Sequence, residues 1–454
     1  MRRRNRTTTR GVTLGVGAVA VTAFLLVATR QNFTVPYTGL GQSPAQLLAL
    51  LLTAAWALTR LRGGRGVPYL LVWRVGVGVH LLAGLAAYAA GMTQGLPEAV
   101  IAQSDRAMVT RVAVIGFAVL VVEVVRTRRQ LEVLVRTVVV AGVVSALAGL
   151  AQFATGVDVG GLLKLPGLQE NATGIGTLAL RAGYARASGS ASVPLEFGAV
   201  MTIVAPLAVT LFLLARRRRT RAWPWAAAAA TLIAAGGVSL SRSVFVGLAV
   251  AFLVLAAGWP VRRSAAVLGA AVVGAGVAWL VAGGVVTDLV GLVTQGTGDY
   301  SLQSRTNGRT YVAERVLVHP WFGQGLGTYQ TGAQPVLDNQ YLSELVESGL
   351  VGVVALVAVL VVVFAVTTRA RVVDPDPDGR DLAAGLSASL AVVATVDLVL
   401  DTAGFAQVLV LGWVVIGLCG SAAHLSEVSR RQFGRLADTG DEPDRRVGDR
   451  PARP

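Results

Sequence analysis

Long apolar stretches follow one another along almost the whole chain, and they limit the possible folds more than any other feature. Runs of 15 to 25 predominantly apolar residues recur, and each could cross a hydrocarbon core of about 30 Å as an α-helix. Of the 454 residues, 54% are hydrophobic, and the mean hydropathy is +0.63. These values exclude an ordinary soluble globular domain. We therefore predict an all-α polytopic membrane protein.

The apolar runs predict about twelve transmembrane helices within a membrane domain of residues 1–424. The expected ranges are 11–29, 42–58, 69–91, 107–125, 131–153, 195–215, 222–240, 243–259, 264–287, 340–367, 381–400 and 402–424. Two connections are long, at about 154–194 and, between spans nine and ten, at about 288–339. The second contains "ERVLVHPWF", which is typical of an amphipathic surface helix, so we expect an ordered subdomain there. Residues 425–454 are rich in Asp, Arg, Gly and Pro, and this composition predicts a disordered tail.

The distribution of basic residues predicts which side each connection faces. A net charge of +15 could indicate nucleic acid binding, but the arginines form short clusters between apolar runs, as membrane topology signals do. With the N-terminus inside, the inner segments hold 28 arginines and the outer ones nine basic residues. We therefore predict a multi-pass protein of the bacterial cell membrane with both termini cytoplasmic and both long connections extracytoplasmic. Membrane lipid is an expected partner and nucleic acid is not.

Four arginines at the predicted outer level are candidates for binding a phosphate-bearing ligand. Arg186 precedes span six, Arg242 lies in the tight turn before span eight, and Arg305 and Arg309 lie in the second long connection. The alternative is an interfacial anchor or ion-pair partner at each position. Arg242 argues against that alternative, because a short outer turn has little need of a cation. Each guanidinium presents a planar fork that matches phosphate oxygens.

The stretch "VLDNQYLSELVESGLVG" places carboxylates at the mouth of span ten. On a helix beginning near Asn339, the polar side chains of Gln340, Glu344 and Glu347 share one stripe. Carboxylates at membrane depth normally face a bundle interior or a watery cavity. Asp338 is expected to cap this helix. Two alternatives stay open, namely that Asp338 only caps and that Glu344 and Glu347 only neutralise arginines.

Other motifs are interpreted as structural. "GQGLG" follows no strand and predicts a turn with close backbone approach. "DPDPDG" has Gly385 where a calcium loop needs a glutamate, and it predicts a solvated turn. One cysteine and three scattered histidines, His80 among them, form no metal-ligand pattern. We expect neither a metal nor another cofactor.

Several of these motifs together resemble the O-antigen ligase and O-antigen polymerase superfamily of membrane glycosyltransferases. The resemblance covers about 181–367 and rests on "RASG" with "PLEFG", "SRS" opening a span, an arginine before "HPWFGQGLGTY", and "DNQYLSELVESGLVG". It implies metal-independent transfer of a glycan from a polyprenyl-diphosphate carrier to a glycan acceptor at the outer face. It also implies that Arg186, Arg242, Arg305 and Arg309 hold the diphosphate, and that other envelope glycan-assembly proteins are possible partners.

The resemblance also indicates which reaction to expect. Ligases of the family have a histidine, thought to act as base, before the asparagine that opens the helix, and this chain has Asp338 before Asn339. This difference favours polymerisation of repeat units, with Asp338 as general base or acceptor-orienting group and Glu196 as a second catalytic candidate. Asn339, Glu344 and Glu347 are expected to support the site. The alternatives are a ligase that transfers a finished glycan and a transporter of polysaccharide or lipid-linked oligosaccharide.

Overall fold

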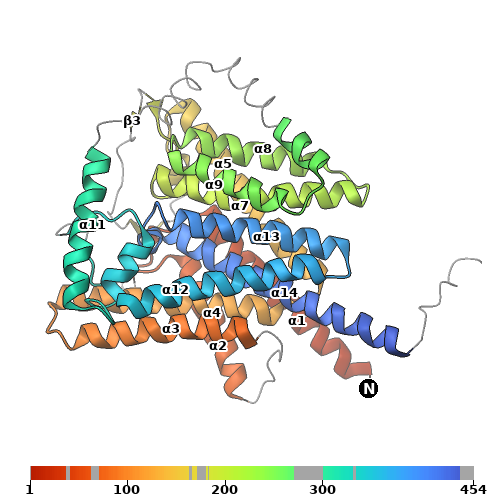
Figure 1. Cartoon of the computed structure of the whole chain (residues 1–454), viewed down its shortest axis with the longest axis horizontal. Helices are drawn as coiled ribbons and strands as arrows, with labels where there is room; N and C mark the ends of the chain where they lie inside the picture. Colours follow the sequence, from red (N-terminus) through yellow and green to blue (C-terminus); the bar gives the residue numbers. More distant parts are fainter. Residues whose placement is uncertain are drawn as a thin grey trace, which may run out of the picture.

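The computed structural model describes residues 2–36, 41–62, 71–162, 166–170, 180–181, 184–269, 300–330 and 334–439, and most of them lie in helices of one bundle (Figure 1). Two antiparallel strand pairs, β1–β2 and β3–β4, have two residues in each strand. The helices and strands are α1 (Arg2–Ala28), β1 (Phe33–Thr34), α2 (Pro44–Leu61), α3 (Leu71–Met92), α4 (Glu98–Val124), α5 (Arg128–Thr155), α6 (Val159–Leu162), β2 (Gln169–Glu170), β3 (Leu180–Arg181), β4 (Tyr184–Ala185), α7 (Pro194–Arg217), α8 (Trp223–Val238), α9 (Arg242–Ala256), α11 (Tyr300–Val318), α12 (Gln340–Val373), α13 (Pro377–Val396), the 3₁₀ turn η1 (Thr402–Gly404) and α14 (Ala406–Thr439).

The predicted all-α membrane architecture is confirmed. Within the described ranges, eight helices are long and apolar enough to cross a membrane, and α1, α8 and α9 contain shorter apolar segments. Each of these helices overlaps a predicted span, although α4 begins at Glu98, well before the predicted start at 107. The ninth predicted span, 264–287, lies largely outside the described residues. The helix α14 continues to Thr439, beyond the predicted start of the disordered tail at 425, and Glu427 pairs with Arg430 and Arg431 on this extension.

Local sequence signals explain where several helices begin. Ser43 and Thr127 each form a capping box, with Gln46 and Gln130 respectively, at the starts of α2 and α5. The helices α2, α7, α8 and α13 have proline in the first turn, where a missing N–H costs no helical hydrogen bond. The apolar runs therefore acquire defined starting points.

Among the helices that could cross a membrane, α7 and α14 are the most enclosed. In their most apolar 18-residue stretches, 83% and 94% of the residues are buried. Glycines allow neighbouring helices to pack closely against them. A Cβ at Gly198 of α7 would lie 2.5 Å from Ser239 Oγ, and one at Gly417 of α14 would lie 2.8 Å from the Ala118 carbonyl oxygen. Small residues are the usual means of close helix packing in membranes.

The bundle has two distinct ends. At one end, which we call the α11 end, α11 runs across the bundle rather than along it (Figure 1). The helices α12, α14, α7 and α9 begin at this end. The start of α1 and the last turns of α14 lie at the opposite end. The predicted outer arginines therefore belong to the α11 end and the arginine clusters to the opposite end.

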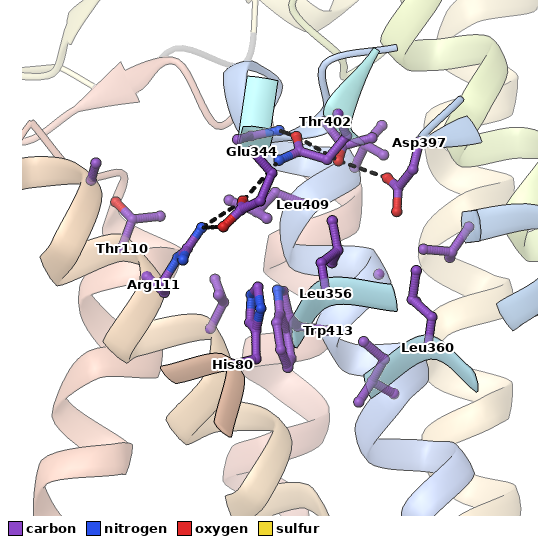
Figure 2. Close-up of a pocket in the computed structure, with 18 of the residues that line it drawn as sticks. His80, Thr110, Arg111, Glu344, Leu356, Leu360, Asp397, Thr402, Leu409 and Trp413 are labelled. Carbon is purple, nitrogen blue, oxygen red and sulfur yellow. Dashed lines mark hydrogen bonds and ion pairs between the residues drawn. The ribbon is translucent and has the colours of Figure 1, made fainter. Parts of the chain in front are cut away.

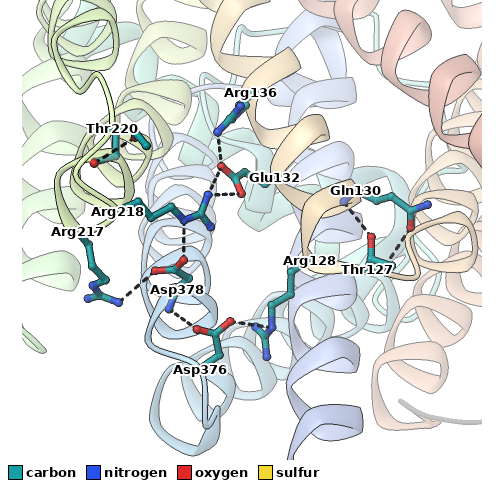
Figure 3. Close-up of polar contacts among 11 residues, drawn as sticks. Thr127, Arg128, Gln130, Glu132, Arg136, Arg217, Arg218, Thr220, Asp376 and Asp378 are labelled. Carbon is teal, nitrogen blue, oxygen red and sulfur yellow. Dashed lines mark hydrogen bonds and ion pairs between the residues drawn. The ribbon is translucent and has the colours of Figure 1, made fainter. Parts of the chain in front are cut away.

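An ionic cluster at the opposite end joins α5, α7 and α13 (Figure 3). Arg218 binds both Glu132, at 2.9 Å, and Asp378, at 2.7 Å. Arg128 binds Asp374 at 2.6 Å, and only 3% of Asp374 is exposed. We call this the Asp378 cluster, and it consists of Arg128, Glu132, Arg136, Arg217, Arg218, Asp374, Asp376, Asp378 and Asp381. The prediction that "DPDPDG" is a solvated turn was wrong, because its carboxylates have partners on helices distant in sequence.

Candidate functional site

The start of α12 differs from the prediction by one residue. Asn339, not Asp338, is the N-cap: its side-chain oxygen accepts from Leu342 N at 3.1 Å, and its amide nitrogen donates to the Leu398 carbonyl at 2.9 Å. Asp338 has φ of 45°, which is uncommon for a residue other than glycine. Such backbone strain is concentrated at functional sites. Asp338 is therefore not the helix cap, and a chemical role for its carboxylate stays open.

A cavity of about 150 Å³ lies beneath the start of α12. Its walls come from α3, α4, α12, α13 and α14 together with η1, so segments distant in sequence create it (Figure 2). The polar residues that line it are His80, Thr110, Arg111, Gln340, Glu344, Glu347, Asp397 and Thr402. The predicted supporting residues Glu344 and Glu347 thus face a common cavity. Arg186, Arg242 and Arg309 do not line it, and the Arg305 side chain lies outside the described part of the structure.

A buried ion pair occupies one wall of this cavity. Arg111 of α4 donates from Nη2 to both oxygens of Glu344, at 3.0 and 2.8 Å. Only 11% of the Arg111 side chain and 3% of the Glu344 side chain are exposed. Gln340 donates weakly to the same carboxylate, at 3.4 Å. Glu344 therefore does neutralise an arginine, but one that the sequence analysis had not considered as a site residue.

His80 of α3 lies beside this pair and stacks on Trp413 of α14, with ring centroids 5.5 Å apart. Sequence analysis treated His80 only as a possible metal ligand and left Arg111 out of the site. A usable signal was present for both, because an ionisable residue inside a transmembrane helix is a functional candidate by default.

Two further aspartates lie between α13 and α14, next to the start of α12. Asp397 accepts from Thr402 Oγ1 at 2.8 Å, and burial raises the pKa of Asp397 to about 7. The pKa of Asp401 is raised to about 6, chiefly by burial and in part by the nearby charges of Glu344 and Asp338. Asp338 and Asp401 are therefore electrostatic neighbours. A carboxyl with a pKa near neutral is suited to proton transfer, and sequence analysis missed both Asp397 and Asp401.

Arg186 and Arg242 both adjoin the turn between α8 and α9. Arg186 donates from Nε to the carbonyl of Ser239, at 2.9 Å, and its neighbour Ala187 donates to the Val238 carbonyl. Arg242 is the first residue of α9, three positions after Ser239. Both arginines are half-buried at the α11 end. One of the four predicted phosphate-binding residues therefore contacts this turn, and a second follows it directly in sequence.

Arg305 and Arg309 belong to α11, as expected for an ordered helix in the second long connection. The Arg309 side chain is exposed, and the Arg305 side chain lies outside the described part of the structure. Gly308, between them in sequence, packs against the segment just before Asp338, since a Cβ there would lie 3.2 Å from the Val336 carbonyl oxygen. This packing places the backbone around Arg309 beside the approach to Asp338.

The remaining predicted carboxylates have backbone partners. Glu196 is 1% exposed and accepts from Ser192 N and Gln407 N, at 2.9 and 2.8 Å, so it joins the starts of α7 and α14. Glu347 accepts from Tyr329 N at 3.0 Å. The catalytic role suggested for Glu196 stays a prediction, and its observed contacts favour a positioning role.

The "GQGLG" turn packs against a break in α12. Gly349 has φ of 65°, and Leu350 N donates to the Pro320 carbonyl at 2.9 Å instead of continuing the helix. In return, Gln324 N and Gly325 N donate to the carbonyls of Val346 and Glu347. Gly323, Gly325 and Gly327 all have positive φ. The prediction of a turn with close backbone approach is confirmed.

The described residues contain no group of three or more His, Cys, Asp or Glu side chains that could hold a metal ion. The metal-independent reaction stays an expectation drawn from the resemblance.

These features define an all-α polytopic membrane protein with a polar cavity inside the bundle and arginines at the same end. Within that class, the family model described as O-antigen ligase matches residues 227–357, and this match supports the O-antigen ligase superfamily. The matched region runs from α8 into α12. It includes Arg242, Asp338 and Glu344 but not Arg186 or Glu196. No curated protein matches the chain.

Proposed function

We propose that the protein is a glycosyltransferase at the extracytoplasmic face that polymerises repeat units of a cell-surface polysaccharide carried on polyprenyl diphosphate. The family match supports the broader statement that the protein is a glycan-ligating or polymerising membrane enzyme. The observation that carries the specific proposal is the contact of Arg186 with the α8–α9 turn, from which Arg242 begins α9. The Arg186 guanidinium is thereby held at the turn that leads into Arg242.

The arginines would bind the diphosphate and stabilise it as a leaving group. Guanidinium groups stay protonated at any physiological pH and can each donate two parallel hydrogen bonds to phosphate oxygens. Arg186 and Arg242 are half-buried, and partial exclusion of water strengthens their interaction with an anion. Arg309, on α11, would contribute from the side of Asp338. Preorganised positive charge of this kind is a large term in catalysis.

The acceptor would be activated by the carboxylates at the start of α12. Asp338 is the proposed base, and Asp401 is its electrostatic neighbour. In the proposed step the acceptor hydroxyl loses its proton to this carboxylate pair while its oxygen bonds to the anomeric carbon. The bond from that carbon to the diphosphate oxygen breaks, and the lipid diphosphate leaves with both electrons. Asp401, whose raised pKa of about 6 suits proton uptake near neutral pH, would share the acceptor's proton.

A ligase that transfers a finished glycan is the alternative within the same superfamily. Asp338, in place of the histidine expected in ligases, favours the polymerase. Both enzymes would use the same arginines, so the two functions differ in the acceptor and in the length of the transferred glycan.

The test is deletion of the gene, followed by mass spectrometry of the polyprenyl-linked intermediates. We expect single repeat units to accumulate on the carrier, and accumulation of long polymer on the carrier would instead identify a ligase. Complementation with Arg242→Ala should restore no polymer at equal protein level. Arg315→Ala is the control, since Arg315 lies on α11, the helix of the other two predicted arginines, but donates to Tyr311 of the same helix. Full activity of Arg242→Ala would contradict the diphosphate-binding role.

A further inference from the structure

Besides the Asp378 cluster, another group of charged residues lies at the end of the bundle opposite α11, between α2, α3 and α4. Glu123, at the end of α4, is 5% exposed and accepts from Arg60 of α2 and Arg74 of α3. Arg126, just after α4, lies 3.7 Å from the same carboxylate. We call these four residues the Glu123 site. Three guanidiniums share a single carboxylate, which leaves a local charge of about +2 from the described residues.

The Asp378 cluster at the same end is different. Four of its residues are arginines and five are acids, so it carries no excess positive charge. Arginine-rich connections are expected at this end for topology alone. The excess of guanidinium groups over carboxylates among ion-paired residues therefore distinguishes the Glu123 site from the Asp378 cluster.

Arg60, Arg74 and Glu123 line a cavity of about 350 Å³ whose other walls are mostly apolar, and Arg126 adjoins it through its contact with Glu123. Val77, Leu81, Ile115 and Val119 line it below the arginines. A Cβ at Gly78, which also lines the cavity, would meet no atom within 4 Å. The cavity thus combines a cationic entrance with an apolar groove, as a lipid with an anionic headgroup would require.

Trp56 adds a hydrogen-bond donor at this entrance. Its ring lies under Arg60, with the guanidinium carbon 5.7 Å from the ring centroid. Its indole N–H is buried and has no hydrogen-bond partner among the described residues. Buried donors normally have partners. An acceptor oxygen from a bound headgroup would satisfy it once the indole turns toward the cavity, since this atom is closed off from solvent in the described structure.

We infer that the Glu123 site binds one anionic glycerophospholipid, with its phosphate among Arg60, Arg74 and Arg126 and an acyl chain along the groove past Gly78. Basic pockets between transmembrane helices are suited to such headgroups, and the cytoplasmic leaflet, which this end is predicted to face, is rich in anionic lipid. The site is separate from the cavity at the α11 end. The inference does not depend on the proposed glycosyltransferase activity.

The experiment is native mass spectrometry of the purified full-length protein in neutral detergent, titrated with phosphatidylglycerol, phosphatidylcholine or undecaprenyl phosphate. We expect saturable binding of one phosphatidylglycerol and much weaker binding of zwitterionic phosphatidylcholine. Equal binding of phosphatidylcholine, or binding of undecaprenyl phosphate but not phosphatidylglycerol, would overturn the assignment.

Three variants locate the lipid. Arg126→Gln removes a headgroup contact while leaving the close Arg60 and Arg74 pairs with Glu123, and it should weaken phosphatidylglycerol binding about fivefold. Gly78→Leu fills the groove, changes no charge and should also weaken binding. Arg136→Gln, in the Asp378 cluster, is the control and should leave binding unchanged. Unchanged affinity in both Arg126→Gln and Gly78→Leu, with the folded protein confirmed by circular dichroism, would refute the site.

Discussion

The buried pair of Arg111 and Glu344 gives a quantitative test of the central cavity. Replacing Arg111 by Met leaves the Glu344 carboxylate, 3% exposed in its side chain, without its cation. Breaking a buried pair from one side costs about 3–5 kcal/mol, because a buried charge is left uncompensated. Glu344→Met likewise leaves the buried Arg111 guanidinium without its carboxylate partner. Each single variant should therefore be strongly destabilised.

The double variant Arg111→Met with Glu344→Met removes both charges and should recover most of the loss. Replacement of a whole buried pair by apolar residues is often neutral. The coupling free energy is the sum of the two single losses minus the loss of the double variant, so we expect about 6 kcal/mol or more in the double-mutant cycle. The assay is denaturant unfolding in one mixed-micelle composition, monitored by far-ultraviolet circular dichroism.

The cycle also separates stability from function. A coupling free energy below about 0.5 kcal/mol would refute the pair as a mutually dependent contact. If the double variant is as stable as the wild type but forms no polymer, the pair also serves the reaction. If the double variant is stable and active, its role is limited to folding.

Three further outcomes are expected. Because the native pKa of Asp401 is raised to about 6, the native state holds this proton above the unfolded pKa of about 4, so stability should fall as pH rises from 4 to 6. Activity that needs the carboxylate should rise over pH 5–7. Asp401→Asn should make the fall in stability less steep, and Asp397 supplies part of the remainder; an unchanged slope would contradict this. Gly349→Ala should lower the unfolding midpoint, since its Cβ would lie 2.4 Å from the Trp321 carbonyl carbon, whereas Gly237→Ala, with open space around it, should not. Membranes treated with EDTA should still form polymer, and loss restored by Mg²⁺ would contradict the metal-independent reaction.

Sequence reasoning predicted the spans well because the signal for a membrane helix is local: it lies in one continuous apolar run. It also predicted the "GQGLG" turn, because glycine adopts positive φ readily and several glycines in a short stretch therefore favour a turn. It did not predict the pair of Arg111 with Glu344, whose partners are 233 positions apart. It placed the α12 cap on Asp338, because aspartate and asparagine cap equally well and only the backbone decides between neighbours.

The acidic turn illustrates the same limit. A run such as "DPDPDG" has the composition of a solvated connection, and nothing in it indicates the arginines of α5 and α7. Asp397 and Asp401 were missed for a related reason, because they lie at the ends of apolar runs and acquire raised pKa values only through burial in the assembled bundle.

The Asp378 cluster has a consequence for how the protein is assembled in the membrane. Glu132 and Arg218 are 86 residues apart, whereas Arg218 and Asp378 are 160 apart, so a chain inserted from its N-terminus completes the first pair well before Asp378 has been synthesised. Until then, the arginines that follow α7 act as topological signals that hold this end of the helix in place. When α13 enters, its carboxylates neutralise those arginines and fix the late helix to the early ones. The same side chains therefore first orient the chain and then close the bundle.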